Sequence, residues 1–155
     1  MKSPRYWLMK SEPDAFSIDD LKSQKTSLWD GVRNYQARNF MMNDMRKGDL
    51  VLFYHSNAKP PGVAGLATVS KEAVPDPTAQ DKKSEYYDAK AAPEKPIWFC
   101  VEVKFKSKFK ELVPLDELKK HKALTEMLVL KKGQRLSIQP VTEKEFQYIL
   151  ELGQG

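Results

Sequence analysis

The chain has 155 residues, 41% of them hydrophobic, and 26 basic against 21 acidic side chains give a formal charge of +5. This length is typical of one domain, so we expect residues 1–155 to form a single domain around one core. The longest apolar or aromatic run, residues 50–54, is far too short to span a bilayer, and no secretory signal is visible, so no membrane association is expected. The single cysteine, Cys100, excludes an intrachain disulfide and is expected to be a buried thiol in a reducing compartment.

The first third of the chain predicts one strand and two helices. Residues 6–9 are apolar and predict a short strand. A short helix over residues 17–22 follows, because Ser17 begins a sequence with the spacing of a capping box. Apolar residues at helical spacing after Asn34 predict a second helix, which is capped by Asn34 and ends near Gly48.

The rest of the chain predicts mainly strands. Residues 50–55 predict a strand buried on both faces, paired with residues 63–69, and residues 73–96 predict a long functional loop. Further strands are expected over 97–109 and 135–139, with Leu136 and Ile138 facing inward and Arg135, Ser137 and Gln139 on the other side, and a helix follows Thr142. Strands with scattered short helices, and no regular alternation, indicate an α+β fold and favour a small mixed barrel.

Positive charge gathers in the second half of the chain. Residues 103–135 carry ten basic residues against four acidic ones. Within this segment Lys104, Lys106, Lys108 and Lys110 alternate with apolar or small residues, so one face of a strand carries a row of lysines. Such a row can contact phosphates, but a solubilising edge strand is an equally good interpretation of lysines alone.

Several kinds of chemistry find little support. With His55, His121 and one cysteine, the sequence offers no metal-ligand cluster, and the phosphate-cradling glycine loop is absent, so we expect neither a metal nor a cofactor. A hydrolase could be assembled from Ser11 or Ser56 with Lys10 or His55. Adjacent residue types are a weak motif without a structural context, and we do not favour this interpretation.

Polar side chains gather where predicted elements end, and in a barrel such ends can line one mouth. They are Lys10, Ser11, Glu12, Arg33, Asn34, Ser56, Arg135 and Ser137. Together with Trp29, which precedes the turn Asp30-Gly31, they would make an aromatic and polar pocket suited to an extruded base. Each also has a structural alternative, since Trp29 could be core, Asn34 a helix cap and Glu12 half of a surface ion pair.

Four segments in order resemble the EVE domain family: residues 7–13, residues 29–39, Gly48-Asp49 with residues 53–56, and residues 135–140. The resemblance covers essentially the whole chain. It implies a PUA-like fold, a mixed β-barrel flanked by short helices, similar to that of the YTH domains that read methylated adenine in RNA. It also implies binding of modified bases in nucleic acid, most often modified cytosine in DNA, and it makes the polar residues above and Trp29 the expected base pocket.

We therefore expect a non-enzymatic, monomeric module that binds DNA with modified bases, or RNA. The expected location is the cytoplasm, or the nucleus in a eukaryotic cell. Arg38 and the four alternating lysines are expected to contact phosphates. Two alternatives stay open: an enzyme that acts on modified nucleic acid with Glu12 as acid or base, and a protein-interaction module.

Overall fold

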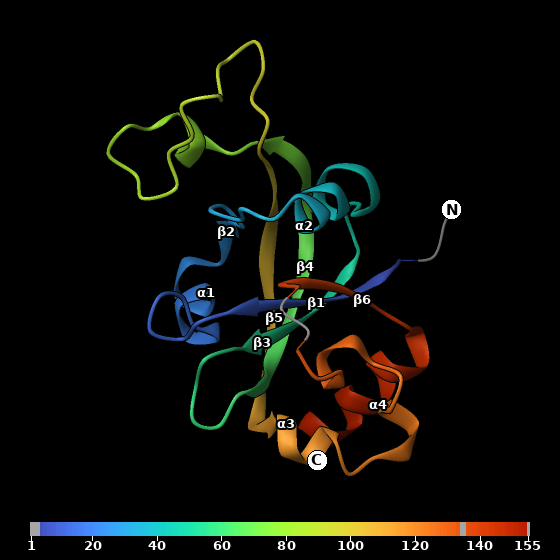
Figure 1. The fold of residues 1–155 in the computed structure, drawn as a ribbon. Helices are drawn as coiled ribbons and strands as arrows, with labels where there is room; N and C mark the ends of the chain where they lie inside the picture. The colour runs from blue at the N-terminus through green and yellow to red at the C-terminus, as the bar shows by residue number, and fades with distance from the viewer. Residues whose placement is uncertain (1–3, 134–135, 155) are drawn as a thin grey trace.

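The structure is a computed structural model that describes residues 4–133 and 136–154, and one mixed six-stranded sheet organises it (Figure 1). The strands lie in the order β2-β5-β4-β3-β1-β6. Their bounds are β1 Tyr6–Ser11, β2 Thr26–Leu28, β3 Leu50–His55, β4 Gly62–Pro75, β5 Phe99–Pro114 and β6 Ile138–Val141. Strands β1 and β3 run parallel and the other neighbouring pairs run antiparallel. In Figure 1 the direction of β1 crosses that of β4 and β5 at a steep angle, so the sheet is strongly twisted into an open, barrel-like shape.

Short helices cover both faces of the sheet. They are α1 Ile18–Gln24, α2 Tyr35–Asn39, the π-helix η1 Phe40–Asp44, the 3-10 helices η2 Pro77–Gln80, η3 Lys122–Leu124 and η4 Leu128–Leu130, and the α-helices α3 Leu115–Leu118 and α4 Glu143–Gln154. Side chains of α1, α2 and η1 pack on one face, and those of α3, η3, η4 and α4 pack on the other. No helix in the described part of the chain is long and apolar enough to cross a membrane.

The central strands contribute side chains to both hydrophobic cores because successive side chains point to opposite faces. In β1, Trp7 and Met9 lie in one core and Leu8 in the other. In β3, Phe53 and Tyr54 divide in the same way. This alternation explains why both segments are apolar throughout, as the sequence analysis expected of strands buried on both faces.

The local capping signals are confirmed. Ser17 accepts from the amide of Asp20 at 3.1 Å in a complete capping box, and the same box begins α4 at Thr142. The side chain of Asn34 accepts from the amide of Ala37 at 2.9 Å and caps α2. These signals depend on residues three positions apart, so the sequence alone carries them.

The expected end of the helix after Asn34 was wrong. The helix after Asn34 does not reach Gly48, because it widens into the π-helix η1 and the backbone becomes extended at Met45. Gly48, with φ +96°, lies instead in the turn that leads into β3. Gln139 lies on the other side of β6 from Ile138, as expected, but this side is also buried: Gln139 is 1% exposed, and its Nε2 donates to the carbonyl oxygen of Leu136 at 2.8 Å. Burial is possible there because this bond satisfies the amide.

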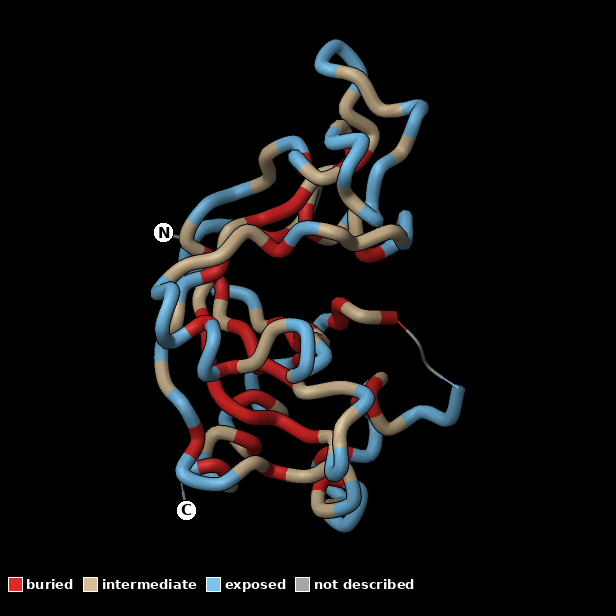
Figure 2. The backbone as a smooth tube through the Cα atoms, turned by 90° about the vertical axis from the view of Figure 1, so that its left-hand side faces the viewer, coloured by how far each residue is buried: buried red, intermediate tan, exposed pale blue. Residues whose placement is uncertain are grey.

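A long excursion, residues 76–98, connects β4 to β5 and extends from one end of the sheet (Figure 1). Figure 2 shows that most of its backbone belongs to exposed residues; Asp76, Ala79 and Trp98 are its buried residues. Asp76 and Trp98 lie at its base, where the amide of Asp76 donates to the carbonyl oxygen of Trp98 at 2.9 Å. The excursion is therefore closed at its base. Farther along it, the carbonyl oxygen of Tyr86 accepts from Arg33, in the turn that follows β2.

Candidate nucleic-acid interface

A cleft of about 1030 Å³ opens between the end of β1, the turn after β2 and the excursion. Seven of the nine residues that the sequence analysis assigned to a base pocket line it: Lys10, Ser11, Glu12, Trp29, Arg33, Asn34 and Ser137. The fold brings residues at the end of β1 together with residues of the turn after β2. Ser137 joins them because its carbonyl oxygen accepts from the amide of Lys10 at 2.8 Å.

The other two assigned residues lie elsewhere. Ser56 lines a neighbouring pocket of about 590 Å³, which meets the cleft at Lys10. The two pockets are close, because the amide of Ser56 donates to the carbonyl oxygen of Ser11 at 3.0 Å. Arg135 lies outside the described residues.

Trp29 belongs to both the core and the cleft. Its side chain is 8% exposed, and its ring meets the ring of Phe53 edge-on at 5.5 Å and 82°. Its amide donates to the carbonyl oxygen of Val101 at 2.8 Å, which anchors the backbone to β5. The indole is therefore held rigidly, and its small exposed part lines the cleft. Phe53 and Tyr54 belong to the two hydrophobic cores.

Asn34 offers a donor at the rim of the cleft. Its side-chain oxygen accepts from the amide of Ala37 at 2.9 Å, so the cap fixes the rotamer. An asparagine side chain also carries an NH₂ group with two donors, which this cap does not use. The capping role and a base-contacting role are thus compatible in one side chain.

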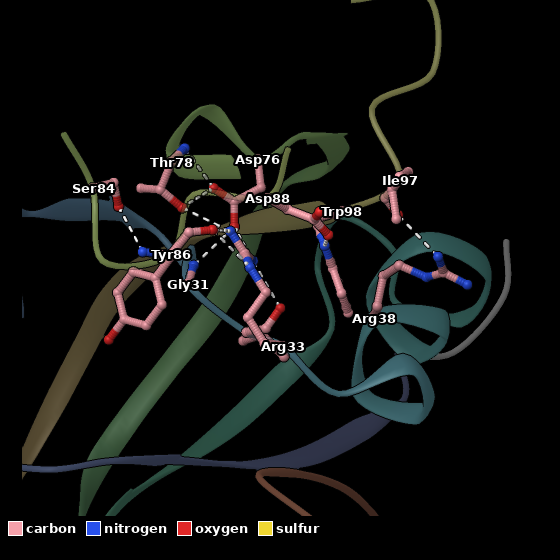
Figure 3. A network of polar contacts seen from close by, with 11 residues as sticks. Gly31, Arg33, Arg38, Asp76, Thr78, Ser84, Tyr86, Asp88, Ile97 and Trp98 are labelled. Carbon is pink, nitrogen blue, oxygen red and sulfur yellow. Dashed lines mark hydrogen bonds and ion pairs between the residues drawn. The ribbon is translucent and has the colours of Figure 1, made fainter. Parts of the chain in front are cut away.

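Arg33 holds one wall of the cleft in place (Figure 3). Its Nε and Nη2 both donate to the carbonyl oxygen of Tyr86, at 3.0 and 2.7 Å. Its Nη1 donates to Asp76 and to its own neighbour Val32, and its Nη2 also donates to Thr78. A guanidinium has five N–H groups, so these five bonds use all of them. Arg33 therefore positions the excursion and has no N–H group left for a base.

Asp76 is the buried partner of this arginine. It is 1% exposed, and it accepts from Arg33 at 3.1 Å and from the amide of Gly31 at 2.8 Å. Burial by itself would raise the pKa of Asp76, but the hydrogen bonds from Thr78, Gly31 and Arg33 together outweigh burial and hold the pKa below its ordinary value. The carboxylate stays ionised and ties the excursion to the turn after Trp29.

Tyr86 is a wall residue that the sequence analysis did not assign to the site. Its ring lies so close to Gly31 that a Cβ on this glycine would come within 2.8 Å of it, and Gly31 has φ +78°. The ring is 39% exposed, lines the cleft and has the Arg33 guanidinium 5.7 Å from its centroid. The available signal was the pair Tyr86-Tyr87 inside an otherwise polar loop, but only the fold places the first of them opposite residues 29–34.

The cleft is acidic. Four carboxylates line it, those of Glu12, Asp30, Glu85 and Glu102, and they face Lys10 and the fully bonded Arg33. Burial, followed by the nearby Asp76, raises the pKa of Asp30, and burial lowers the pKa of Lys10. Such a lining suits the amino edge of a base better than a phosphate, because carboxylates accept hydrogen bonds from amino groups and repel anions.

The residues expected to contact phosphate lie apart from the cleft. Lys104, Lys106, Lys108 and Lys110 are exposed along β5 as the alternation predicted, and Lys108 forms an ion pair with Asp19 at 2.9 Å. Arg38 donates to the carbonyl oxygen of Ile97 at 2.9 Å and to the side chain of Asn39. None of these five residues lines the cleft or the neighbouring pocket.

Ser11 and His55 do not form a pair of nucleophile and base. Its hydroxyl donates to the carbonyl oxygen of Phe16 at 2.5 Å, while Nε2 of His55 accepts from the amide of Ile18 at 3.1 Å. Both side chains thus serve the start of α1. In the described part of the chain, no three His, Cys, Asp or Glu side chains gather in a way that could hold a metal ion.

Comparison with known proteins gives consistent matches. The model of the EVE domain matches residues 5–152. Thymocyte nuclear protein 1 of Homo sapiens is 47% identical, and the match covers 95% of this chain and 73% of that protein. A hypothetical protein from Leishmania major has a TM-score of 0.92 at 54% identity, covering 97% of this chain and 95% of that one.

A further solved structure includes a ligand. The crystal structure of human THYN1 protein in complex with 5-methylcytosine-containing DNA has a TM-score of 0.89 at 46% identity, and the match covers 97% of this chain and 98% of that one. The DUF55 domain of human thymocyte nuclear protein 1 matches with a TM-score of 0.88. These likenesses confirm the expected α+β, PUA-like mixed barrel flanked by short helices.

Proposed function

We propose that this chain, which belongs to the EVE domain family, is a non-enzymatic module that takes a modified, flipped-out base of a nucleic-acid strand into the cleft beside Trp29. Modified cytosine in DNA is the proposed ligand. The observation that carries the proposal is the match, with a TM-score of 0.89, to a human protein in complex with 5-methylcytosine-containing DNA. A single domain over residues 1–155, action as a monomer, and a cytoplasmic or nuclear location are part of the proposal, and RNA is the alternative strand.

Stacking would supply much of the affinity. A flipped base would enter between Trp29, held by Phe53 and Val101, and Tyr86, held by Arg33. Stacking on an aromatic side chain is worth about 1–3 kcal/mol per base. Because the partners of both rings fix them in advance, little of that free energy is lost in ordering the walls.

The polar lining would select the base. The amino group of cytosine is a donor that Asp and Glu side chains accept, and Glu12 and Asp30 lie on the cleft. The amide of Asn34 would donate to the acceptor atoms of the same base edge. Thymine has a carbonyl oxygen in place of the amino group and an N–H donor in place of the acceptor ring nitrogen, so this lining favours cytosine over thymine.

Apolar side chains would respond to the modification. Phe16, Leu28 and Val32 line the cleft, and an added methyl group in close contact with such side chains gains about 1–3 kcal/mol. The non-enzymatic interpretation is supported by the side chains of Ser11 and His55, which are engaged in local structure. Glu12, the acid or base of the enzyme alternative, accepts from Asn57 at 3.3 Å.

The test is fluorescence anisotropy of short labelled oligonucleotides. Plain strands are compared with strands that carry 5-methylcytosine, 5-hydroxymethylcytosine or N6-methyladenine, as DNA and as RNA, at low and physiological salt. We expect a preference for a modified cytosine that persists as salt rises, because stacking and base contacts release no counterions. Equal affinities that vanish with salt would contradict the proposal. Turnover of the strand that is lost in Glu12→Gln would favour an enzyme, and no binding at all would favour a protein-interaction module.

A further inference from the structure

Beside the acidic cleft lies a pocket of opposite charge. Its volume is about 590 Å³, and four lysines line it: Lys10, Lys119, Lys131 and Lys132. We call it the lysine pocket. None of its described lining residues is acidic, whereas the cleft has four carboxylates. Two adjacent hollows of opposite charge suit two different parts of one ligand.

Three separate parts of the fold supply the lysines of this pocket. Lys10 is the last residue but one of β1, Lys119 follows α3, and Lys131 and Lys132 follow η4. Lys119 and Lys132 are exposed, and Lys131 forms a long, exposed ion pair of 3.6 Å with Glu126, a kind of pair that contributes little stability. Four cationic side chains around one concavity attract anions more strongly than the same charges spread over a convex surface.

Neutral donors complete the lining. Ser56 supplies a hydroxyl and Asn57 an amide. Tyr54 forms part of the wall, with the Lys10 ammonium 6.0 Å from its ring centroid, and burial raises the pKa of this tyrosine to about 12, so its hydroxyl stays protonated. Phosphate oxygens accept hydrogen bonds from ammonium, hydroxyl and amide groups alike.

The pocket and the cleft are contiguous. Lys10 lines both, and Tyr54 lies opposite Lys10 in the parallel pairing of β1 with β3. Nearby, the side chain of Asn57, on the pocket, donates to Glu12, on the cleft, at 3.3 Å. A strand that places a base in one hollow would therefore bring an adjacent part of its backbone to the other.

We propose that the lysine pocket binds a backbone phosphate next to the flipped nucleotide, while the acidic cleft receives the base. This inference rests on the proposed function and names a second subsite for it. Charge divides the two tasks: the carboxylates repel phosphate from the cleft, and the lysines attract it to the pocket. The exposed row on β5, which the sequence analysis favoured, lines neither hollow and has one lysine paired with Asp19.

The experiment combines a charge-removing variant with a charge-removing ligand. Lys119→Ala with Lys132→Ala removes two pocket charges, and the matched control, Lys106→Ala with Lys110→Ala, removes two charges from the β5 row. All four side chains are exposed, so both variants should fold, which thermal unfolding checks. The probes are single strands with one 5-methylcytosine in which one phosphate at a time is replaced by an uncharged methylphosphonate.

We expect the wild type to lose affinity several-fold at one or two phosphates next to the modified base. In the pocket variant, methylphosphonate replacement at those positions should cause no further loss of affinity. The slope of log affinity against log salt should fall by about 1 for each phosphate that the protein no longer neutralises. The control should keep the wild-type response at those positions. In both variants the ratio of affinities for modified and plain strands should stay unchanged.

Two outcomes would overturn the inference. One is a pocket variant that keeps the wild-type sensitivity to every methylphosphonate, even if modified strands are still preferred. The other is a response confined to a terminal phosphate, which would make the pocket a strand-end site. Failure of the proposed function has a separate signature, because the wild type would then bind modified and plain strands equally.

Discussion

The guanidinium of Arg33 donates two hydrogen bonds to the carbonyl oxygen of Tyr86, at 3.0 and 2.7 Å. The same group bonds Asp76, which also accepts from the amide of Gly31 at 2.8 Å. One arginine therefore joins the turn after Trp29 to a segment more than fifty residues away. A cleft whose two walls are fixed in this way loses less free energy on binding than one whose wall must be ordered by the ligand.

The contact between Gly31 and the ring of Tyr86 leads to a prediction with an internal control. In Gly31→Ala the new Cβ would lie 2.8 Å from the Tyr86 ring, so the ring must move. Gly48 also has positive φ, +96°, but a Cβ there meets no atom within 4 Å. We expect both alanine variants to lose about 1–2 kcal/mol of unfolding free energy through backbone strain. Only Gly31→Ala should weaken binding of the modified strand, as measured by anisotropy. Equal affinities of the two variants would show that Tyr86 is not part of the binding wall.

The ionised state of Asp76 gives a prediction for stability against pH. The pKa of Asp76 in the folded protein lies below the ordinary 3.8. Its contribution to the free energy of unfolding is therefore complete well above pH 3.8 and is lost as pH falls below that value. Asp76→Asn resembles the protonated carboxyl. We expect this variant to be less stable than the wild type by about 1.5–3 kcal/mol at neutral pH, since its hydrogen bonds involve a charged group. Urea unfolding from pH 7 to pH 3 should show a constant difference down to about pH 5 that narrows below pH 4. A difference that stays constant or widens at low pH would contradict this account.

The two possible roles of Asn34 can be separated by substitution. Asn34→Asp keeps an oxygen that accepts from Ala37, so α2 should keep its cap and its stability, whereas Asn34→Ala should lose about 1 kcal/mol. Both variants lose the amide donor. We therefore expect both to discriminate less between 5-methylcytosine and thymine in the same strand, by about 1 kcal/mol. Comparing these ratios removes the effect of the added charge on overall affinity. If Asn34→Asp discriminates as the wild type does, Asn34 is only a helix cap.

Local features of this fold could be predicted from the sequence, because residues close in the chain determine them. The boxes at Ser17 and Thr142 and the cap at Asn34 need only a spacing of three residues. The buried strands could be recognised from unbroken apolar runs. Polar residues at element boundaries, such as Lys10–Glu12 and Arg33-Asn34, were expected to line one mouth of a barrel, and the cleft contains both stretches.

The long-range parts of the site could not be predicted in the same way. Apart from Val32, the partners of Arg33 lie 43 to 53 residues further along the chain, and no local pattern marks Asp76 or Tyr86 as belonging to the site. Arg33 was therefore interpreted as a base contact, although the fold uses every one of its N–H groups in the wall. The lysine pocket was missed for the same reason, since three separate segments contribute its charges. The alternating row on β5 was visible because it is local.

Trp29 carries the most direct test of the cleft. Truncation to alanine would leave a cavity against Phe53 and cost about 3–5 kcal/mol, so Trp29→Phe is the more useful variant. A phenyl ring keeps part of this packing but offers a smaller stacking face. We expect Trp29→Phe to lose most of the preference for the modified base and to keep the salt-dependent background, because lysines supply the latter.

Trp7→Phe is the matched control for Trp29→Phe. Trp7 is fully buried, donates to Asp49 at 3.0 Å and does not line the cleft. Its variant should lose stability as well, yet retain the ratio of affinities for modified and plain strands. Anisotropy on both strands, below the unfolding temperature of each variant, measures this ratio. If Trp29→Phe weakens binding of modified and plain strands by the same factor, the indole does not read the base, and the cleft beside it is not the modified-base site.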